Sequence, residues 1–419
     1  MIAALVVAVV AVPGLAALVL VGRDQTPQAP ALRTSTLSAD AFVDSIGVGT
    51  HLNYFDTAYA RLPELVARLR ELGVHHIREA VPAPTGQHAD ALRAVGAAGL
   101  KATLGNGDPG SDPARWVADG ISLIGDQAVA FEAPNELDNT DYADWPAQLR
   151  TYMPALVAAV REQAPGADVI GPSFIDSASR ALIPNDLPGL FNGHPYSGGL
   201  PPEGALDQAL DERRATTPGR GVVFTEAGYH NALNATAGQP PASEEAAAVY
   251  LPRLLATAFG AGVRRTFLYE LVDEKPDPGL IDAEQHFGLL RNDLSPKPAF
   301  TAIKTMIAAV QASPGERSGA PLEPQVQVDS GDPVERVTLQ RADGSLAILL
   351  WRPVSVWDRD ARKPADPGRD GVELSFPGLG ARDVTVWRPS VSTEPVIERE
   401  RAQRLELELE GDLVLVSLR

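Results

Sequence analysis

The most restrictive feature of the sequence is a regular alternation between residues 44 and 310. Short apolar runs, typical of buried strands, alternate with longer segments that carry apolar residues at three- and four-residue spacing, typical of helices. Strands that alternate with helices form parallel sheets. Eight strand–helix units can be counted here, and eight units over about 270 residues fit a closed barrel better than an open sheet. We therefore predict an α/β fold, a (β/α)8 TIM barrel spanning residues 34–312.

The boundaries of these elements follow from local signals. Leucines recur at helical spacing over residues 61–72 and Gly73 ends the segment, while Asp112 and Pro113 are typical of a helix start. The predicted strands are 44–53, 74–78, 101–105, 129–135, 168–174, 189–196, 221–226 and 265–271. The predicted helices are 61–72, 88–98, 112–124, 147–163, a short one near 177–182, 203–215, 243–260 and 298–310.

The pattern changes after the last predicted helix. Residues 313–324 are rich in Pro, Gly and Ser, which indicates a linker. Beyond them, short and mostly alternating runs are separated by turn residues, which is typical of an all-β module. The runs are 334–340, 346–351, 371–376, 383–387, 404–409 and 413–418. We predict that residues 325–419 form a smaller β-sandwich domain.

The N-terminal segment is almost wholly apolar from Ile2 to Val21. A run of about 20 such residues can span a bilayer, and it can equally be a secretory signal. The usual basic residues before the run are missing, and Ala29-Pro-Ala31 is a weak cleavage site. We predict that residues 1–33 are a signal peptide or membrane anchor with a linker, and that the protein is exported; a buried core helix is the alternative.

Charge and cysteine content exclude several classes of protein. Asp and Glu outnumber Lys and Arg by 54 to 36, for a formal net charge of −18. Nucleic-acid binding needs clustered basic residues, so we expect no nucleic-acid partner. The chain has no cysteine, which excludes disulfides, thiolate metal sites and a cysteine nucleophile. The sequence predicts no cofactor and does not define an oligomeric state.

Polar side chains follow the predicted strands where the strands end, which is where chemistry occurs in such barrels. Glu136 ends the apolar run that begins at Val129, and Glu226 ends the run that begins at Val222. We predict that these two carboxylates face each other across a polar cleft. The strand-end residues are His51, Arg78, Asn106, Asn135, Glu136, His194, Tyr196, Glu226 and Glu270.

Two carboxyl groups in different protonation states are what hydrolysis of a glycosidic bond requires: one protonates the leaving oxygen, and the other attacks the anomeric carbon or activates water. Tyr196 is placed to donate a hydrogen bond to Glu226, and a nearby Arg78 would favour its ionised form. Asn135 could form a hydrogen bond with a sugar hydroxyl near the reacting centre. Glu132 shares the inward parity of Glu136 on the same strand, and we predict it to be a buried, paired carboxyl.

Asn135-Glu136 on the fourth strand and Thr225-Glu226-Ala227-Gly228 on the seventh resemble the signature of clan A glycoside hydrolases. Arg78, His194-x-Tyr196 and the segment 286–300 resemble further clan positions, and the C-terminal β-domain resembles that of family 39 and its relatives. The resemblance covers roughly residues 40–312. It implies that Glu136 is the acid/base, that Glu226 is the nucleophile, and that the anomeric configuration is retained.

The end of the eighth strand departs from the clan, in which many members carry a tryptophan under the sugar. This chain has Tyr269 there, followed by the additional carboxylate Glu270. We expect Tyr269, Glu270, His51 and Asn106 to line the sugar site, and we assign no metal.

Other interpretations stay open at this point. Arg78 could form a structural ion pair with Glu79 or another barrel carboxylate, and His194 and Tyr196 could be packed loop residues without a catalytic effect. Instead of a hydrolase, the chain could be an inactive carbohydrate-binding or envelope scaffold protein, or a transglycosylase.

Overall fold

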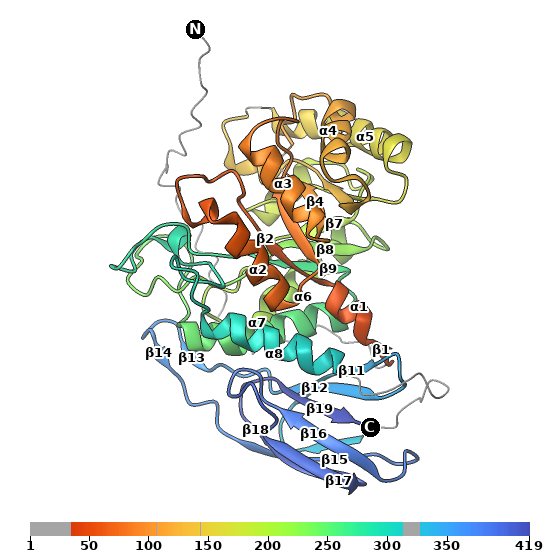
Figure 1. The fold of residues 1–419 in the computed structure, drawn as a ribbon, viewed down its shortest axis with the longest axis vertical. Coiled ribbons are helices and arrows are strands. Elements are labelled where there is room, and N and C mark those ends of the chain that lie inside the picture. The colour runs from red at the N-terminus through yellow and green to blue at the C-terminus, as the bar shows by residue number, and fades with distance from the viewer. Residues whose placement is uncertain (1–34, 106, 143, 313–326) are drawn as a thin grey trace.

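The computed structural model describes residues 35–105, 107–142, 144–312 and 327–419. Figure 1 shows two parts, a barrel wrapped by helices and a β-domain beneath it, with α7 and α8 between them. The predicted N-terminal segment, the predicted linker at 313–324 and Asn106 lie outside the described residues. No helix of the described part of the chain is long and apolar enough to cross a membrane.

The barrel is built from eight parallel strands in the order β6-β5-β4-β3-β2-β9-β8-β7. A parallel bridge between Ile170 and Leu190 joins β6 to β7 and closes the ring. The strands are β2 (Ile46–Gly49), β3 (His76–Ala80), β4 (Lys101–Gly105), β5 (Ala128–Glu132), β6 (Asp168–Ile170), β7 (Phe191–Gly193), β8 (Val222–Ala227) and β9 (Arg265–Leu268). The predicted TIM barrel is confirmed.

The helices of the barrel lie on its outside and begin and end at the signals seen in the sequence. Gly73 adopts a left-handed φ of 85° after α2, as a glycine at a helix C-terminus commonly does. The side chains of Asp112 and Ser243 accept hydrogen bonds from the first turns of α4 and α7. The helices are α1 (Ala39–Asp44), α2 (Leu62–Leu72), α3 (Gln87–Ala97), α4 (Pro113–Ile124), α5 (Trp145–Gln163), α6 (Pro202–Thr216), α7 (Glu244–Gly260) and α8 (Pro298–Gln311), and a 3-10 turn, η4 (Ser177–Leu182), follows β6.

The β-domain is a sandwich of a six-stranded sheet, in the order β1-β11-β12-β19-β16-β17, and a three-stranded sheet, β10-β15-β18. Apolar residues such as Ile348, Leu374, Leu407 and Val416 fill the space between the sheets. The strands are β1 (Leu37–Ser38), β10 (Gln327–Ser330), β11 (Glu335–Gln340), β12 (Leu346–Trp351), β15 (Asp370–Ser375), β16 (Arg382–Trp387), β17 (Ile397–Ala402), β18 (Arg404–Leu409) and β19 (Val414–Leu418), with a small ribbon of β13 (Trp357–Asp358) and β14 (Lys363–Pro364). The predicted β-domain is confirmed.

The two parts share one hydrophobic core. All six residues of β12 are buried, because one face of its sheet packs in the sandwich and the other contacts the barrel. Trp351 on that second face donates its Nε1–H to Glu203 of α6 at 2.9 Å, and Glu203 also pairs with Arg253 of α7. In addition, β1 lies beside β11, so residues 37–38 contribute to the β-domain although the sequence suggested that they belong to the barrel.

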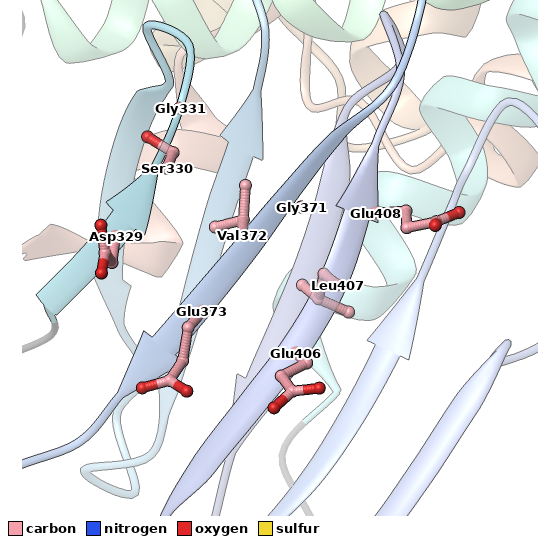
Figure 2. A pocket seen from close by; sticks show the side chains of 9 residues that line it. All are labelled: Asp329, Ser330, Gly331, Gly371, Val372, Glu373, Glu406, Leu407 and Glu408. Carbon is pink, nitrogen blue, oxygen red and sulfur yellow. The ribbon is translucent and has the colours of Figure 1, made fainter.

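The outer face of the three-stranded sheet carries a row of acidic side chains beside a shallow groove of about 540 Å³. Glu373 of β15 is directly opposite Asp329 of β10 on one side and Glu406 of β18 on the other. Figure 2 shows these carboxylates and Glu408 projecting from three neighbouring strands. Because like charges directly opposite each other destabilise a sheet, the row reduces the stability of this edge of the domain.

Candidate active site

The chain leaves β5 in a way that lifts Glu136 into the barrel mouth. The backbone N–H of Ala133 still pairs with β6, but Pro134 has no N–H to donate and the pairing ends there. Glu136 then takes a left-handed backbone conformation, φ 43° and ψ 48°, before a 3-10 turn over Leu137–Asn139. Such a conformation is unfavourable for a residue with a Cβ, and strain of this kind clusters at functional sites.

Glu136 and Glu226 approach each other across the end of the barrel. Each offers a carboxylate oxygen, and these oxygens lie within 4.8 Å of one another, together with a ring nitrogen of His194. Both side chains remain partly accessible, at 20% for Glu136 and 13% for Glu226. Carboxyl groups about 5–5.5 Å apart are typical of retaining glycosidases, and separations of about 6.5–9.5 Å are typical of inverting ones.

Glu226 is held in its ionised form. Arg78 donates from Nη1 to Glu226 Oε1 at 2.5 Å, and Tyr196 donates its hydroxyl to Oε2 at 2.8 Å. Burial by itself would raise the pKa of the Glu226 carboxyl. The positive charges of His194 and Arg78 and the two hydrogen bonds outweigh burial and lower this pKa from 4.5 to about 2. Glu226 is therefore an ionised carboxylate that carries no proton at neutral pH.

Arg78 is itself fixed by a buried carboxylate below it. Its Nε and Nη2 donate to the two oxygens of Glu132 at 2.6 and 3.0 Å. Glu132 is fully buried and accepts two more hydrogen bonds, from Asn192 Nδ2 at 3.0 Å and from the Thr225 hydroxyl at 2.8 Å. A bidentate pair of this kind sets the direction of the guanidinium, so Glu132 orients Arg78 toward Glu226. The alternative pairing of Arg78 with Glu79 does not occur; Glu79 accepts from Thr50 instead.

His194 connects the two sides of the site. Its Nδ1 lies 2.6 Å from Glu136 Oε1 and its Nε2 lies 2.8 Å from Thr225 Oγ1. The pKa of His194 is raised: burial opposes protonation, but the charge of Glu226 and the contact with Glu136 outweigh it.

The proton positions follow from the neighbours of Thr225. Its hydroxyl faces Glu132 Oε1 and Asn192 Oδ1, and both of these atoms accept. The backbone N–H of Thr225 also donates to Asn192 Oδ1, which fixes the amide orientation. A hydroxyl has one proton to donate, so it accepts from His194 Nε2–H. His194 Nδ1 and Glu136 Oε1 then share one further proton, since their 2.6 Å contact is a hydrogen bond only with a proton between them.

Asn135 presents a defined side of its amide to the cleft. Its Oδ1 accepts from Arg78 Nη2 at 2.8 Å and from the Ser173 hydroxyl at 3.0 Å. The acceptor side of the amide is thus occupied, and the Nδ2 group is what Asn135 can offer to a ligand.

A second cluster adjoins this centre at the ends of β2 and β9. Tyr59, in the short 3-10 helix Ala58–Ala60, donates its hydroxyl to Glu270 Oε2 at 2.6 Å. His51 stacks on Tyr54 with ring centroids 4.6 Å apart, and its edge contacts Tyr269 at 5.6 Å. The structure thus groups the predicted residues into two sets. Arg78, Asn135, Glu136, His194, Tyr196 and Glu226 form the first set, and His51, Tyr269 and Glu270 belong to the second.

Several contributing residues were missed from the sequence. Thr225 was recognised only as part of the motif with Glu226 and was given no role, and Ser173 follows β6, so their positions near strand ends were a usable signal. Asn192 within β7 and Tyr59 in its short 3-10 helix carry no such signal. Glu284, which accepts from the Tyr269 hydroxyl at 3.4 Å, also lies in a 3-10 helix, Ala283–Gln285.

Two groups of side chains offer convergent metal ligands among the described residues: Glu136, His194 and Glu226, and, separately, His51, Glu270 and Glu274. In the first group, Arg78 forms an ion pair with Glu226 and His194 contacts Glu136. These protein groups already balance the two carboxylates, so we assign no metal ion there.

No protein-family model and no curated protein sequence matches the chain. Solved structures do match it over nearly its whole length. A family 39 glycoside hydrolase (GH39) enzyme of Xanthomonas axonopodis pv. citri is 18% identical with a TM-score of 0.57, covering 94% of this chain and 98% of that chain. A monomeric β-xylosidase of Caulobacter crescentus CB15 is 15% identical with a TM-score of 0.57, covering 93% and 98%.

A glucosidase of Croceicoccus marinus is 11% identical with a TM-score of 0.57, covering 84% of this chain and 91% of that chain. At these identities the common property is the fold. The chain therefore has the barrel and appended β-domain seen in these glycosidases. The resemblance to clan A and family 39 is confirmed at the level of the fold.

Proposed function

We propose that this protein is a retaining glycoside hydrolase, with Glu226 as the nucleophile and Glu136 as the acid/base. The observation that carries the proposal is the pair of carboxylates within 4.8 Å at the barrel mouth, in different environments. Arg78 and Tyr196 keep Glu226 ionised, while Glu136 shares a proton with His194. A nucleophile must be ionised and an acid must hold a proton, so the two environments match the two roles.

The reaction proceeds in two displacements. Glu226 forms a bond to the anomeric carbon as the glycosidic carbon–oxygen bond breaks, and Glu136 gives its proton to the leaving oxygen. Glu136 then takes a proton from water, the water oxygen attacks the anomeric carbon, and the bond to Glu226 breaks. Arg78 and His194 are positioning residues: Arg78 aims Glu226, and His194 holds the Glu136 carboxyl through the 2.6 Å contact of its Nδ1.

The substrate class is a β-linked, or equivalent equatorial, O-glycoside of a polysaccharide or glycoconjugate. Solved structures with the same fold include a β-xylosidase and a glucosidase, which supports beginning with β-xylosides and β-glucosides. We also propose that residues 2–21 direct the protein out of the cytoplasm. A fusion of residues 1–40 to a reporter that is active only after export tests this; an inactive reporter would contradict it.

The direct test is a screen of residues 34–419 against 4-nitrophenyl glycosides and wall polysaccharides. On a responsive substrate, Glu136→Gln should lower kcat by about 10²–10⁴-fold, the contribution of one general acid/base, and Glu226→Gln by at least as much. Glu245→Gln, a carboxylate on α7 away from the cleft, is the control and should leave kcat unchanged. Near-normal turnover by either cleft variant, with a native melting temperature, would refute the assignment.

Two other functions use the same fold. An inactive carbohydrate-binding scaffold would bind oligosaccharides with no turnover in the wild type, but it has no need for two carboxylates with different partners. A transglycosylase would transfer the sugar to an added acceptor instead of water, and product analysis with and without the acceptor separates it from a hydrolase.

A further inference from the structure

The second cluster at the barrel mouth contains polar atoms that its protein neighbours do not satisfy. The Glu270 side chain is fully buried. Its Oε2 accepts from Tyr59, but its Oε1 has no hydrogen-bond partner among the residues that the structure describes. The Nε2 atom of His51 is also buried without a hydrogen-bond partner there, and it lies 3.6 Å from Glu270 Oε2. Buried polar groups in native proteins are almost always satisfied, so these atoms need a ligand or an ordered water.

The charge of the cluster indicates the sign of that ligand. Glu270 and Glu274 bring two carboxyl groups to one point, where their oxygens converge with a ring nitrogen of His51. The adjacent Lys275 cannot compensate them, because its Nζ pairs with Asp56 at 2.8 Å. Within the described ranges, the ion pairs give Glu270 only the weak contact to His51. The cluster is therefore an acidic site without its own cation.

The geometry of the cluster suits a metal ion. His51, Glu270 and Glu274 each offer one ligand atom, and these atoms lie within 4.8 Å of one another. Ligands about 2.0–2.2 Å from a zinc ion lie at most about 4.4 Å apart, so a small inward movement of the side chains brings all three into contact with one ion. The Tyr59 hydroxyl orients the Glu270 carboxylate and Tyr54 fixes the ring plane of His51, as the outer contacts of metal ligands commonly do.

We propose that His51, Glu270 and Glu274 bind one divalent transition-metal ion, of the Zn²⁺ or Mn²⁺ type, in the wall of the cleft. An imidazole nitrogen favours such ions over Ca²⁺ and Mg²⁺, which prefer all-oxygen sites. Three protein ligands leave a coordination position for water or a substrate oxygen. The site is separate from Glu136 and Glu226, and its binding of metal does not depend on the proposed reaction.

The proposal is tested on chelator-treated protein, residues 34–419, by titration calorimetry with ZnCl₂ and MnCl₂ and by the visible spectrum of added Co²⁺. The chain has no cysteine, so no thiolate competes for the metal. One equivalent of Zn²⁺ or Mn²⁺ should bind and raise the melting temperature, and CaCl₂ and MgCl₂ should bind at least about tenfold more weakly.

Three variants decide the result. His51→Phe keeps a ring against Tyr54 but removes the nitrogen, and Glu270→Gln keeps the shape but removes the charge; each should weaken binding by at least about tenfold. Glu245→Gln removes a carboxylate on α7, away from the cluster, and it should bind metal as the wild type does. Absence of saturable binding, unchanged affinity in His51→Phe, or an equal loss in Glu245→Gln overturns the proposal, and His51→Phe decides it alone if Glu270→Gln does not fold.

Discussion

The hydrogen bond from Tyr196 to Glu226 can be tested through its effect on the pKa of Glu226. A hydrogen bond to a charged group contributes about 1.5–3 kcal/mol, and a pKa unit corresponds to 1.36 kcal/mol. Tyr196→Phe should therefore raise the pKa of Glu226 from about 2 by roughly one to two units. The acidic limb of the kcat/KM profile should move up by the same amount, because the nucleophile then protonates at higher pH.

Tyr229→Phe is the matched control, because this buried hydroxyl donates to the Leu200 carbonyl and not to Glu226. Its acidic limb should coincide with that of the wild type. A Tyr196→Phe profile that also coincides with the wild type would show that this hydrogen bond does not hold Glu226 ionised.

The left-handed backbone conformation of Glu136 should make the glycine and alanine variants at this position differ in stability. Glycine adopts this conformation without strain, whereas a residue with a Cβ is disfavoured by about 1–2 kcal/mol. Glu136→Gly should therefore be more stable than Glu136→Ala by about 1 kcal/mol in urea unfolding. At Glu212, inside α6, the order should reverse, because glycine destabilises a helix interior by about 1 kcal/mol relative to alanine. If the glycine variant were less stable than the alanine variant at both positions, the backbone of Glu136 would not be strained.

The residues of the site could be predicted to the extent that they lie at strand ends. Glu136, Glu226, Arg78 and Tyr196 were recognisable because each follows or ends an apolar run. Tyr59 could not be found this way, since its contact with Glu270 joins residues 211 positions apart in the chain. The hydrogen bonds of Thr225 also depend on Glu132 of β5, Asn192 of β7 and His194 after β7 meeting at one hydroxyl, which no local pattern encodes.

At the scale of elements, the acidic row on β15 offers a test of cross-strand electrostatics. Glu373 is opposite Asp329 and Glu406, and among the residues that the structure describes a 3.8 Å contact with the exposed Arg404 offsets this. Glu373→Gln should stabilise the protein by roughly 0.2–1 kcal/mol, and salt should reduce the gain because it screens exposed charges.

Glu398→Gln on β17 is the control, because its cross-strand partner is the uncharged Thr385. It should change the free energy of unfolding little. A loss of stability in Glu373→Gln would mean that the Arg404 pair outweighs the repulsion.

Elements with strong periodicity were predictable and those without it were not. The strand at Lys101–Gly105 and the helix at Pro113–Ile124 match the sequence patterns, because both have regular apolar spacing and clear ends. β17, with the sequence Ile-Glu-Arg-Glu-Arg-Ala, was missed because it is an edge strand with almost no buried face. The predicted strands 168–174 and 189–196 are shorter in the structure because their ends turn into the barrel mouth.

For the whole molecule, the junction of barrel and β-domain depends on a buried ion pair. Arg253 is fully buried and Glu203 nearly so, and Arg253 also donates to the carbonyls of Val354 and Gly411 in the β-domain. Removing one partner of a buried pair costs about 3–5 kcal/mol. Glu203→Ala should therefore lower the free energy of unfolding by this amount.

Asp211→Ala on the same helix breaks an exposed pair with Arg214 and should cost less than about 1 kcal/mol. The double variant Glu203→Gln with Arg253→Met should recover much of the loss, because it leaves no unpaired buried charge. Equal effects of Glu203→Ala and Asp211→Ala would show that the junction does not depend on this pair.

The overall architecture was predictable because eight units repeat one pattern, and a single missed element does not change the count. The contact of β1 with β11 was not predictable, since it joins residues about 300 positions apart in the chain and a two-residue strand has no periodicity. The same holds for the shared core, in which both faces of β12 are buried.

The central claim is that Glu226 attacks the sugar and Glu136 supplies the proton. The most direct measurement is covalent trapping with a 2-deoxy-2-fluoroglycosyl fluoride of the sugar that the screen identifies, followed by mass spectrometry of the intact protein and of its peptides. The account predicts one sugar per chain, attached to Glu226, and no label in Glu226→Gln. A label on any other residue, or turnover of the parent glycoside to the inverted anomer without a trapped sugar, would contradict it.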